Sequence, residues 1–195
     1  MKVVLATNNK GKLKEFRSLL APVGLDLVGQ AELGIASAPE TGTTFVENAL
    51  EKARHVSAMS EYPALSDDSG LVVDCLQGEP GIHSARFAGS DATDEDNNNK
   101  LLALLGDGQS RSAHFYCVLV FLRHAQDPAP IIATGQWHGS IAINPKGHNG
   151  FGYDPLFFVP ELGLTSAELD PEAKNRISHR GLAVQELCAK LAPLI

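Results

Sequence analysis

The chain has 195 residues, of which 44% are hydrophobic and 20% are charged, a composition typical of a folded globular protein and not of a disordered chain. Its 16 Lys and Arg against 23 Asp and Glu give a net charge of −7. This balance argues against a nucleic-acid-coating protein, because binding to a phosphate backbone needs a basic surface. The length fits one domain over residues 1–195.

No membrane attachment is predicted. The longest apolar run, near residues 118–122, is well below the roughly 20 residues that span a bilayer, and the run at Lys2–Ala6 is too brief for a signal peptide. The three cysteines, Cys75, Cys117 and Cys188, lie far apart beside apolar residues and form no CxxC pair. We therefore expect buried free thiols in a reducing compartment, the cytoplasm.

The first third of the chain predicts two strands and two helices. A strand at Lys2–Ala6 is followed by a polar turn and a helix whose apolar residues recur at helical spacing through Leu20. A second strand is predicted at Leu25–Val28. A capping box beginning at Thr44 predicts a helix that reaches about Val56.

In the middle third, Ala64–Ser66 and Leu71–Val73 flank the sequence Asp-Asp-Ser-Gly, which predicts two strands joined by an acidic turn. Thr93 is a suitable cap for a helix to about Leu105, stopped by two glycines. The stretch 113–122 is apolar on both alternating faces, which is typical of a strand in the middle of a covered sheet.

In the last third, Ile131–Trp137 and Ser140–Ile143 predict two further strands in a hairpin or meander. A glycine-broken loop then leads into a strand at Leu156–Val159. The Asp-Pro pair at 170–171 begins a helix, and Leu182–Leu191 predicts the closing helix. The predicted class is α/β with a mixed sheet.

Several catalytic motifs are excluded. Gly11-Lys12 follows a strand as a P-loop would, but Leu13 follows the lysine and Ala6 stands where the first glycine is required. The chain has no GxSxG nucleophile elbow and no HExxH, and its seven histidines show no zinc-ligand spacing.

The turn Thr7-Asn8-Asn9-Lys10-Gly11-Lys12 is the first candidate site. A helix N-terminus offers free N–H groups and a positive dipole end, to which this turn adds hydroxyl, amide and ammonium donors, so it could bind an anion. The alternative is a plain N-cap followed by a solvated basic face.

The second candidate is Asp67-Asp68-Ser69-Gly70. One carboxylate could serve as a general base or as an oxygen ligand for Mg²⁺, with Glu40, Glu47 or Glu51 as possible co-ligands. Two acids in a tight turn are also common where they only hydrogen-bond their own backbone.

Two further candidates lie near the C-terminus. In Phe151-Gly152-Tyr153-Asp154 an aromatic ring could stack on a base and Asp154 could accept hydrogen bonds from it; the alternative is a turn with core aromatics. Lys174 suits a phosphate and Arg180 suits a carbonyl or phosphate, although solvated charges at a helix terminus are the commoner case. With Lys52 on a core-facing helical stripe, these cations, acids and aromatics together match what a nucleoside triphosphate needs.

The sequence resembles the inosine triphosphate pyrophosphatase family almost end to end. Six blocks of the chain carry the resemblance in order: residues 7–12, 40–53 (Glu-Thr-Gly-Thr-Thr-Phe-Val-Glu-Asn-Ala through Lys-Ala), 66–71 (Ser-Asp-Asp-Ser-Gly-Leu), 80–86 (Pro-Gly-Ile-His-Ser-Ala-Arg), 150–155 (Gly-Phe-Gly-Tyr-Asp-Pro) and 174–180 (Lys-Asn-Arg-Ile-Ser-His-Arg).

The resemblance implies hydrolysis of ITP, dITP and XTP between the α and β phosphates, with Mg²⁺. It implies an elongated mixed sheet with flanking helices, two lobes around a central nucleotide cleft, and a homodimer. Asp68 is implied as the proton acceptor and as a metal ligand with Glu40, and Ser69 as a substrate contact. The triphosphate is expected at Thr7, Asn8, Asn9, Lys10, Gly11, Lys12, Lys52 and Lys174, and the base at Phe151, Gly152, Tyr153, Asp154, His179 and Arg180.

Two other functions remain open at this point. One is a pyrophosphatase for other modified nucleotides, and the other is a nucleotide-binding module without turnover. The small-molecule triphosphate is the expected partner in each case, with no nucleic acid and no membrane.

Overall fold

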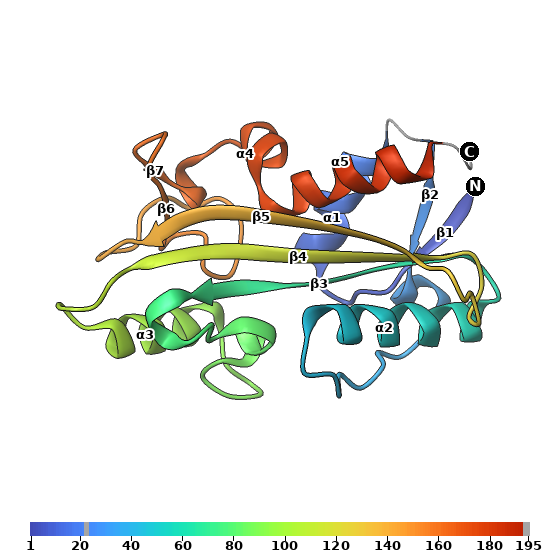
Figure 1. The fold of residues 1–195 in the computed structure, drawn as a ribbon, viewed down its shortest axis with the longest axis horizontal. Coiled ribbons are helices and arrows are strands. Elements are labelled where there is room, and N and C mark those ends of the chain that lie inside the picture. Colours follow the sequence, from blue (N-terminus) through green and yellow to red (C-terminus); the bar gives the residue numbers. More distant parts are fainter. Residues whose placement is uncertain (22–23, 193–195) are drawn as a thin grey trace. The chain divides into compact units, whose positions relative to one another are not determined.

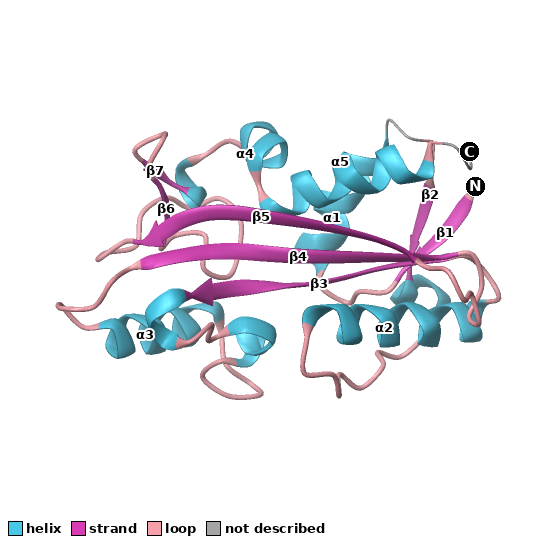
Figure 2. Ribbon diagram, viewed as in Figure 1, coloured by secondary structure: helices cyan, strands magenta, loops and turns pink. Residues whose placement is uncertain are grey.

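We describe a computed structural model covering residues 1–21 and 24–192. Its strands form one seven-stranded mixed sheet in the order β2-β1-β3-β4-β5-β6-β7, with helices packed on it (Figure 2). β1 is parallel to β2 and β3, whereas β6 is antiparallel to β5 and β7. The helices and strands are β1 (Lys2–Leu5), α1 (Lys10–Leu20), β2 (Asp26–Gly29), α2 (Phe45–Ser60), β3 (Ala64–Val73), α3 (Asp94–Leu105), β4 (Ser112–Leu122), β5 (Ile131–Ile141), β6 (Phe157–Val159), β7 (Leu164–Thr165), α4 (Pro171–Ile177) and α5 (His179–Leu191).

The chain forms two compact units. Unit 1 comprises residues 1–68, 117–135 and 180–195, and unit 2 comprises residues 69–116 and 136–179. β3, β4 and β5 each contribute residues to both. The sequence predicts the α/β class correctly.

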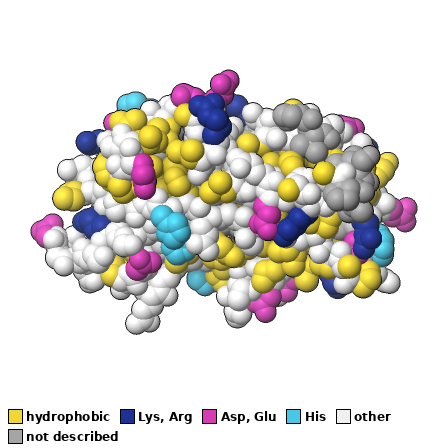
Figure 3. Space-filling model, turned by 45° about the horizontal axis from the view of Figure 1, so that its top comes forward, with side chains coloured by type: hydrophobic (Ala, Val, Ile, Leu, Met, Phe, Trp, Pro, Cys, Tyr) yellow, Lys and Arg dark blue, Asp and Glu magenta, His cyan; other side chains and the backbone are white. Residues whose placement is uncertain are grey.

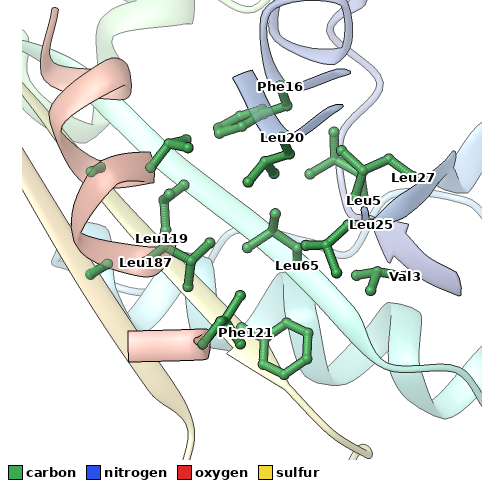
Figure 4. Close-up of a cluster of buried hydrophobic side chains, with 14 of the residues drawn as sticks. Val3, Leu5, Phe16, Leu20, Leu25, Leu27, Leu65, Leu119, Phe121 and Leu187 are labelled. Carbon is green, nitrogen blue, oxygen red and sulfur yellow. The ribbon is translucent and has the colours of Figure 1, made fainter. Parts of the chain in front are cut away.

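In unit 1, α1 and α5 cover one face of the sheet and α2 covers the other (Figure 1). Leu5 and Leu65 pack under α1 and α5 with Phe16, Leu119 and Leu187 in a core of fully buried side chains (Figure 4). This packing follows from the alternation of side chains along each strand, which sends every second residue to the same face.

Unit 2 has its own core, in which aromatic side chains dominate. Phe115 packs against Phe157, their ring centroids 4.6 Å apart, and Trp137 lies 5.0 Å from Phe157. α3 contributes the fully buried Leu101 and Leu105 to this core, so that helix is firmly attached to the strands of its unit.

Two predicted strand breaks are wrong, and both contain a glycine. Residues 64–73 form the single strand β3, and residues 131–141 form the single strand β5. At Gly70 a Cβ atom would lie 2.2 Å from the carbonyl oxygen of Gly81, and at Gly139 it would lie 2.5 Å from that of Phe158. These glycines permit close approach of a neighbouring segment and do not turn the chain.

Other differences are smaller. The last helix begins at His179, three residues earlier than predicted, and the short strand β7 was not predicted. Cys117 is buried, but Cys75 and Cys188 are only half-buried; all three are free thiols. No helix within residues 1–21 and 24–192 has the length and apolar character needed to cross a membrane.

Candidate functional site: a carboxylate and lysine cluster on β3

Two consecutive buried carboxylates lie in the middle of β3. Asp67 is 1% exposed and Asp68 is 6% exposed. Adjacent strand residues point to opposite faces, so Asp67 lies on the face of α1 and α5 and Asp68 on the face of α2. Ser66, which shares its face with Asp68, donates a hydrogen bond to the carbonyl oxygen of Ala49 in α2.

On the α1 face, Asp67 meets two cations. Lys12 Nζ lies 2.8 Å from Asp67 Oδ2, and Arg180 Nε lies 3.9 Å from the same oxygen. The guanidinium of Arg180 also pairs with the carboxylate of Glu15. Burial alone would raise the pKa of Asp67, but the charges of Lys12 and then of Arg180 and Lys52 lower it to about 2. Asp67 is therefore ionised at any working pH.

On the α2 face, Asp68 meets a single lysine. Lys52 Nζ lies 2.8 Å from Asp68 Oδ1 and 3.1 Å from Glu40 Oε1, so one ammonium group is shared by two carboxylates. Asn48 Nδ2 approaches Asp68 Oδ2 at 3.4 Å. Burial raises the pKa of Asp68 above its usual value, and Lys52 offsets this only in part. Of the two aspartates, Asp68 is the one whose pKa is shifted toward the range of a general base.

Pairing with these carboxylates also shifts the pKa of Lys52. Burial alone would lower the pKa of Lys52, but Asp68 and then Asp67 raise it, so Lys52 is a cation whose charge is held in place by its carboxylates.

The turn after β1 is built mainly to begin α1. Asn9 caps the helix, its Oδ1 accepting a hydrogen bond from the Lys12 amide at 3.0 Å, and Thr7 Oγ1 accepts one from the Asn9 amide. Asn8 bonds to Ser37 and Gln30, while Lys10 is exposed. The N-cap that the sequence offered as the alternative to an anion site is therefore present. Binding of phosphate at this turn, including Gly11, stays a prediction.

Unit 2 holds a second group of predicted site residues around Asp154. Its Oδ1 accepts a hydrogen bond from Ser166 Oγ at 2.7 Å, and its Oδ2 accepts from the Phe151 amide at 2.8 Å and from Lys174 Nζ at 2.7 Å. Lys174 is only 6% exposed, and its Nζ lies 5.5 Å from the centroid of the Phe151 ring. This group is a buried ion pair beneath a half-buried aromatic ring.

The other predicted contacts in unit 2 differ in burial. Tyr153 is buried in the core, its hydroxyl donating to the carbonyl of Ser84 at 2.9 Å, whereas Ser69 is half-buried on β3. His179 is buried and stacks on Phe115 with ring centroids 4.7 Å apart. The roles of these residues in substrate binding stay predictions.

The structure thus brings Lys52, Asp68 and Glu40 together on the α2 face of β3, and it pairs Lys12 with Asp67 on the other face. Three supporting residues, Glu15, Asn48 and Ser166, were not identified as site residues from the local sequence pattern. Asn48 lies one helical turn before Lys52, and a polar residue at a core position was the available signal. Glu15 and Ser166 gave no local signal, because their partners are distant in sequence.

The acidic groups fit a divalent cation of the kind that accompanies phosphates. Within the described part of the chain no group of three or more His, Cys, Asp or Glu residues could hold a metal ion. Mg²⁺, however, is usually bound by one or two carboxylates together with substrate phosphates and water. Asp68 and Glu40, which converge on one ammonium group, form such a pair.

On the face drawn in Figure 3, the described part of the surface shows no patch of basic side chains that would offset the acidic composition. There the lysine and arginine side chains stand apart from one another, several of them beside an acidic side chain. The buried cations described above are therefore the cationic groups that we consider for an anionic ligand.

These features define a mixed α/β protein with buried carboxylates on strand β3 that pair with lysines from α1 and α2. The profile of the Ham1 family matches residues 3–190, and the chain belongs to that family. It is 56% identical over 186 residues to the dITP/XTP pyrophosphatase of Yersinia pseudotuberculosis, with 94% of each chain covered. It is also 56% identical over 188 residues to the protein of the same name from Escherichia coli K12, with 95% of each covered. The structure of a HAM1 protein from Coxiella burnetii matches with a TM-score of 0.91 and 46% identity over 99% of both chains.

Proposed function

We propose that this protein is a nucleoside triphosphate pyrophosphatase that hydrolyses ITP, dITP and XTP to the monophosphate and pyrophosphate. The names of the relatives support this activity, which removes altered purine nucleotides from the pool. The observation that carries the proposal for this chain is the burial of Asp68 beside Lys52, because it combines a carboxylate of raised pKa with a fixed cation.

In the proposed reaction, Asp68 accepts a proton from water as the water oxygen bonds to the α phosphorus. The bond from that phosphorus to the bridging oxygen breaks, and pyrophosphate leaves with the electron pair. Lys12 and Lys52 hold the phosphate oxygens, where charge gathers, with Lys174 and the turn at 7–12 as further contacts. Charge stabilisation of this kind contributes more to such reactions than a nucleophilic side chain does.

Mg²⁺ is the proposed cofactor, held by Asp68 and Glu40. When bound it would neutralise phosphate charge and polarise the phosphoryl oxygens. The cations of unit 1 support this proposal, because Lys12 and Lys52 are already paired with Asp67 and Asp68. A triphosphate with several negative charges therefore needs additional positive charge.

The proposed base contacts are Phe151 to Asp154, with His179 and Arg180. Hypoxanthine and xanthine carry a keto acceptor at position 6, where adenine carries an amino donor. A site with fixed donors there leaves them unpaired against adenine, which costs binding energy and gives strong discrimination. Ser69 is proposed as a further substrate contact. We also propose that residues 1–195 act as one domain, in a cytoplasmic homodimer.

The decisive experiment measures pyrophosphate and orthophosphate released from ITP, XTP, dITP, GTP and ATP, with Mg²⁺ and with EDTA. Metal-dependent pyrophosphate from the first three, with little from GTP or ATP, is the expected result. Orthophosphate as the first product would overturn the assigned bond. Preference for modified pyrimidine triphosphates would change the substrate class, and binding of ITP without product would leave a binding module.

Lys174 offers a separate test of the substrate contacts. Lys174→Ala is expected to raise the KM for ITP about tenfold while kcat changes little, since a charged hydrogen bond is worth roughly 1.5–3 kcal/mol. Thermal unfolding must be measured beside it, because the change also removes the partner of buried Asp154. An unchanged KM in a folded variant would remove Lys174 from the site.

A further inference from the structure

The segment Phe151–Tyr153 is fixed at each of its three residues by a different group of unit 2. The Phe151 amide donates to Asp154, and the Tyr153 hydroxyl donates to the carbonyl of Ser84. Gly152 lies between them with a left-handed φ of +61°. A Cβ atom there would meet no other atom within 4 Å, so side-chain packing does not fix this residue.

The peptide groups on both sides of Gly152 are held by α3. The Gly152 amide donates to Asp94 Oδ2 at 2.7 Å, and its carbonyl accepts from Asn98 Nδ2 at 3.0 Å. Asp94 and Asn98 are one helical turn apart, so they present their side chains on the same side of α3. We call these two residues the α3 clamp.

The helix that carries the clamp is a rigid support. Beside its buried leucines, Asn97 accepts a hydrogen bond from the Ala88 amide at 2.7 Å and donates one to the Ala85 carbonyl at 3.2 Å. The helix is therefore tied to the preceding segment as well as to the core, and it can transmit that rigidity to Gly152.

We propose that Asp94 and Asn98 are positioning residues that set the orientation of the Phe151 ring for the base of the substrate. This inference rests on the proposed function, and it adds a specificity role for α3. The Phe151 and Gly152 amides already donate hydrogen bonds to Asp154 and Asp94. Gly152 therefore contributes to base binding through its backbone conformation and not through its amide. Loss of the clamp frees both peptide groups to rotate while leaving Asp68 and its partners unchanged.

Asp94→Ala, Asp94→Asn and Asn98→Ala test this proposal. Their controls are Glu95→Ala and Asn99→Ala, which alter exposed neighbours in the same turns of the helix. Asp94→Ala and Asn98→Ala are expected to raise the KM for ITP about tenfold, with kcat within about threefold of the wild type, the size expected for one lost hydrogen bond. Asp94→Asn should recover most of the loss, because an amide oxygen can still accept from Gly152. If Glu95→Ala raises KM to a comparable extent, the increase is due to the loss of negative charge at the helix N-terminus, and the proposed role of the α3 clamp is wrong.

Amide hydrogen exchange supplies a readout that does not depend on activity. In Asp94→Ala the Gly152 amide should exchange at least about tenfold faster, while the Phe151 amide, which donates to Asp154, keeps its protection. Faster exchange with an unchanged KM would overturn the positioning role. If the wild-type protein binds ITP without hydrolysing it, the proposed function fails, and the Kd for ITP replaces KM in the same comparison. If it does not bind ITP at all, both proposals fail.

Discussion

The two faces of β3 in unit 1 place adjacent aspartates in opposite electrostatic settings. Asp67 meets Lys12 and Arg180, and its pKa falls to about 2 although it is fully buried. Asp68 shares its one lysine with Glu40, and its pKa rises. Burial raises the pKa of both aspartates; the charges of Lys12, Arg180 and Lys52 outweigh it at Asp67, whereas those of Lys52 and Lys12 do not at Asp68.

This difference in pKa bears on which aspartate is suited to the proposed proton transfer. A carboxylate with a pKa near 2 is too weak a base to take a proton from water efficiently near neutral pH, whereas one with a raised pKa is better matched to that task. This difference in pKa supports the proposed role of Asp68 in proton transfer, while Asp67 pairs with Lys12 and lies near Arg180.

The largest expected effect is on catalysis. Asp68→Asn should lower kcat by roughly 10²–10⁴, the usual contribution of a positioned base, while nucleotide binding and the fold persist. The measurement is initial-rate kinetics with ITP, beside circular dichroism. Turnover near the wild-type level would show that Asp68 is not the base and would make Asp67 the next candidate.

The second effect is on stability and belongs to the other face. Asp67→Asn leaves Lys12 and Arg180 without their shared carboxylate in a buried place, and removal of one partner from such a cluster costs about 3 kcal/mol or more. Urea denaturation should show a larger loss for Asp67→Asn than for Asp68→Asn. Equal losses of unfolding free energy in the two variants would mean that Asp67 and Asp68 stabilise the fold to the same extent.

The pH dependence of the unfolding free energy tests the lowered pKa of Asp67 directly. The pKa of Asp67 is lower in the folded protein than in the unfolded chain, so its contribution is complete above about pH 4 and is lost as the pH falls toward 2. The expected size is about 2 kcal/mol. The difference in unfolding free energy between the wild type and Asp67→Asn should shrink across this range. A difference that is constant from pH 5 to pH 2 would contradict the lowered pKa.

The elements of the fold were predictable from the sequence wherever local rules decide them. The polar turn before the first helix, the cap at Thr44 and the Asp-Pro pair at 170–171 place the starts of α1, α2 and α4 within a few residues. The continuity of β3 through Gly70 and of β5 through Gly139 was not predictable. A glycine needed for close approach of a distant segment has the same local surroundings as a glycine in a turn.

The sequence identified part of the candidate cluster by the same local rules. Lys12, Lys52 and Asp68 were identifiable because each stands beside a turn or on a core-facing stripe. The sequence could not separate Asp67 from Asp68, since the distinction depends on Arg180, which is 113 positions away from Asp67 in the chain and reaches it only through the packing of α5. Charge pairing across that separation is a property of the folded molecule.

The smallest expected effect tests the second group that touches Asp68. Asn48→Ala removes a donor at 3.4 Å, a long hydrogen bond, so the loss should be about 1 kcal/mol or less, equivalent to a kcat reduction of up to fivefold. With this donor gone the charged form of Asp68 is less stabilised, so the acidic limb of the pH–rate profile should shift to higher pH. The matched control is Ser57→Ala, a buried polar residue on the same helix that bonds to the Tyr62 carbonyl. If Asn48→Ala leaves the limb in place, or if Ser57→Ala shifts it equally, Lys52 alone sets the chemistry of Asp68.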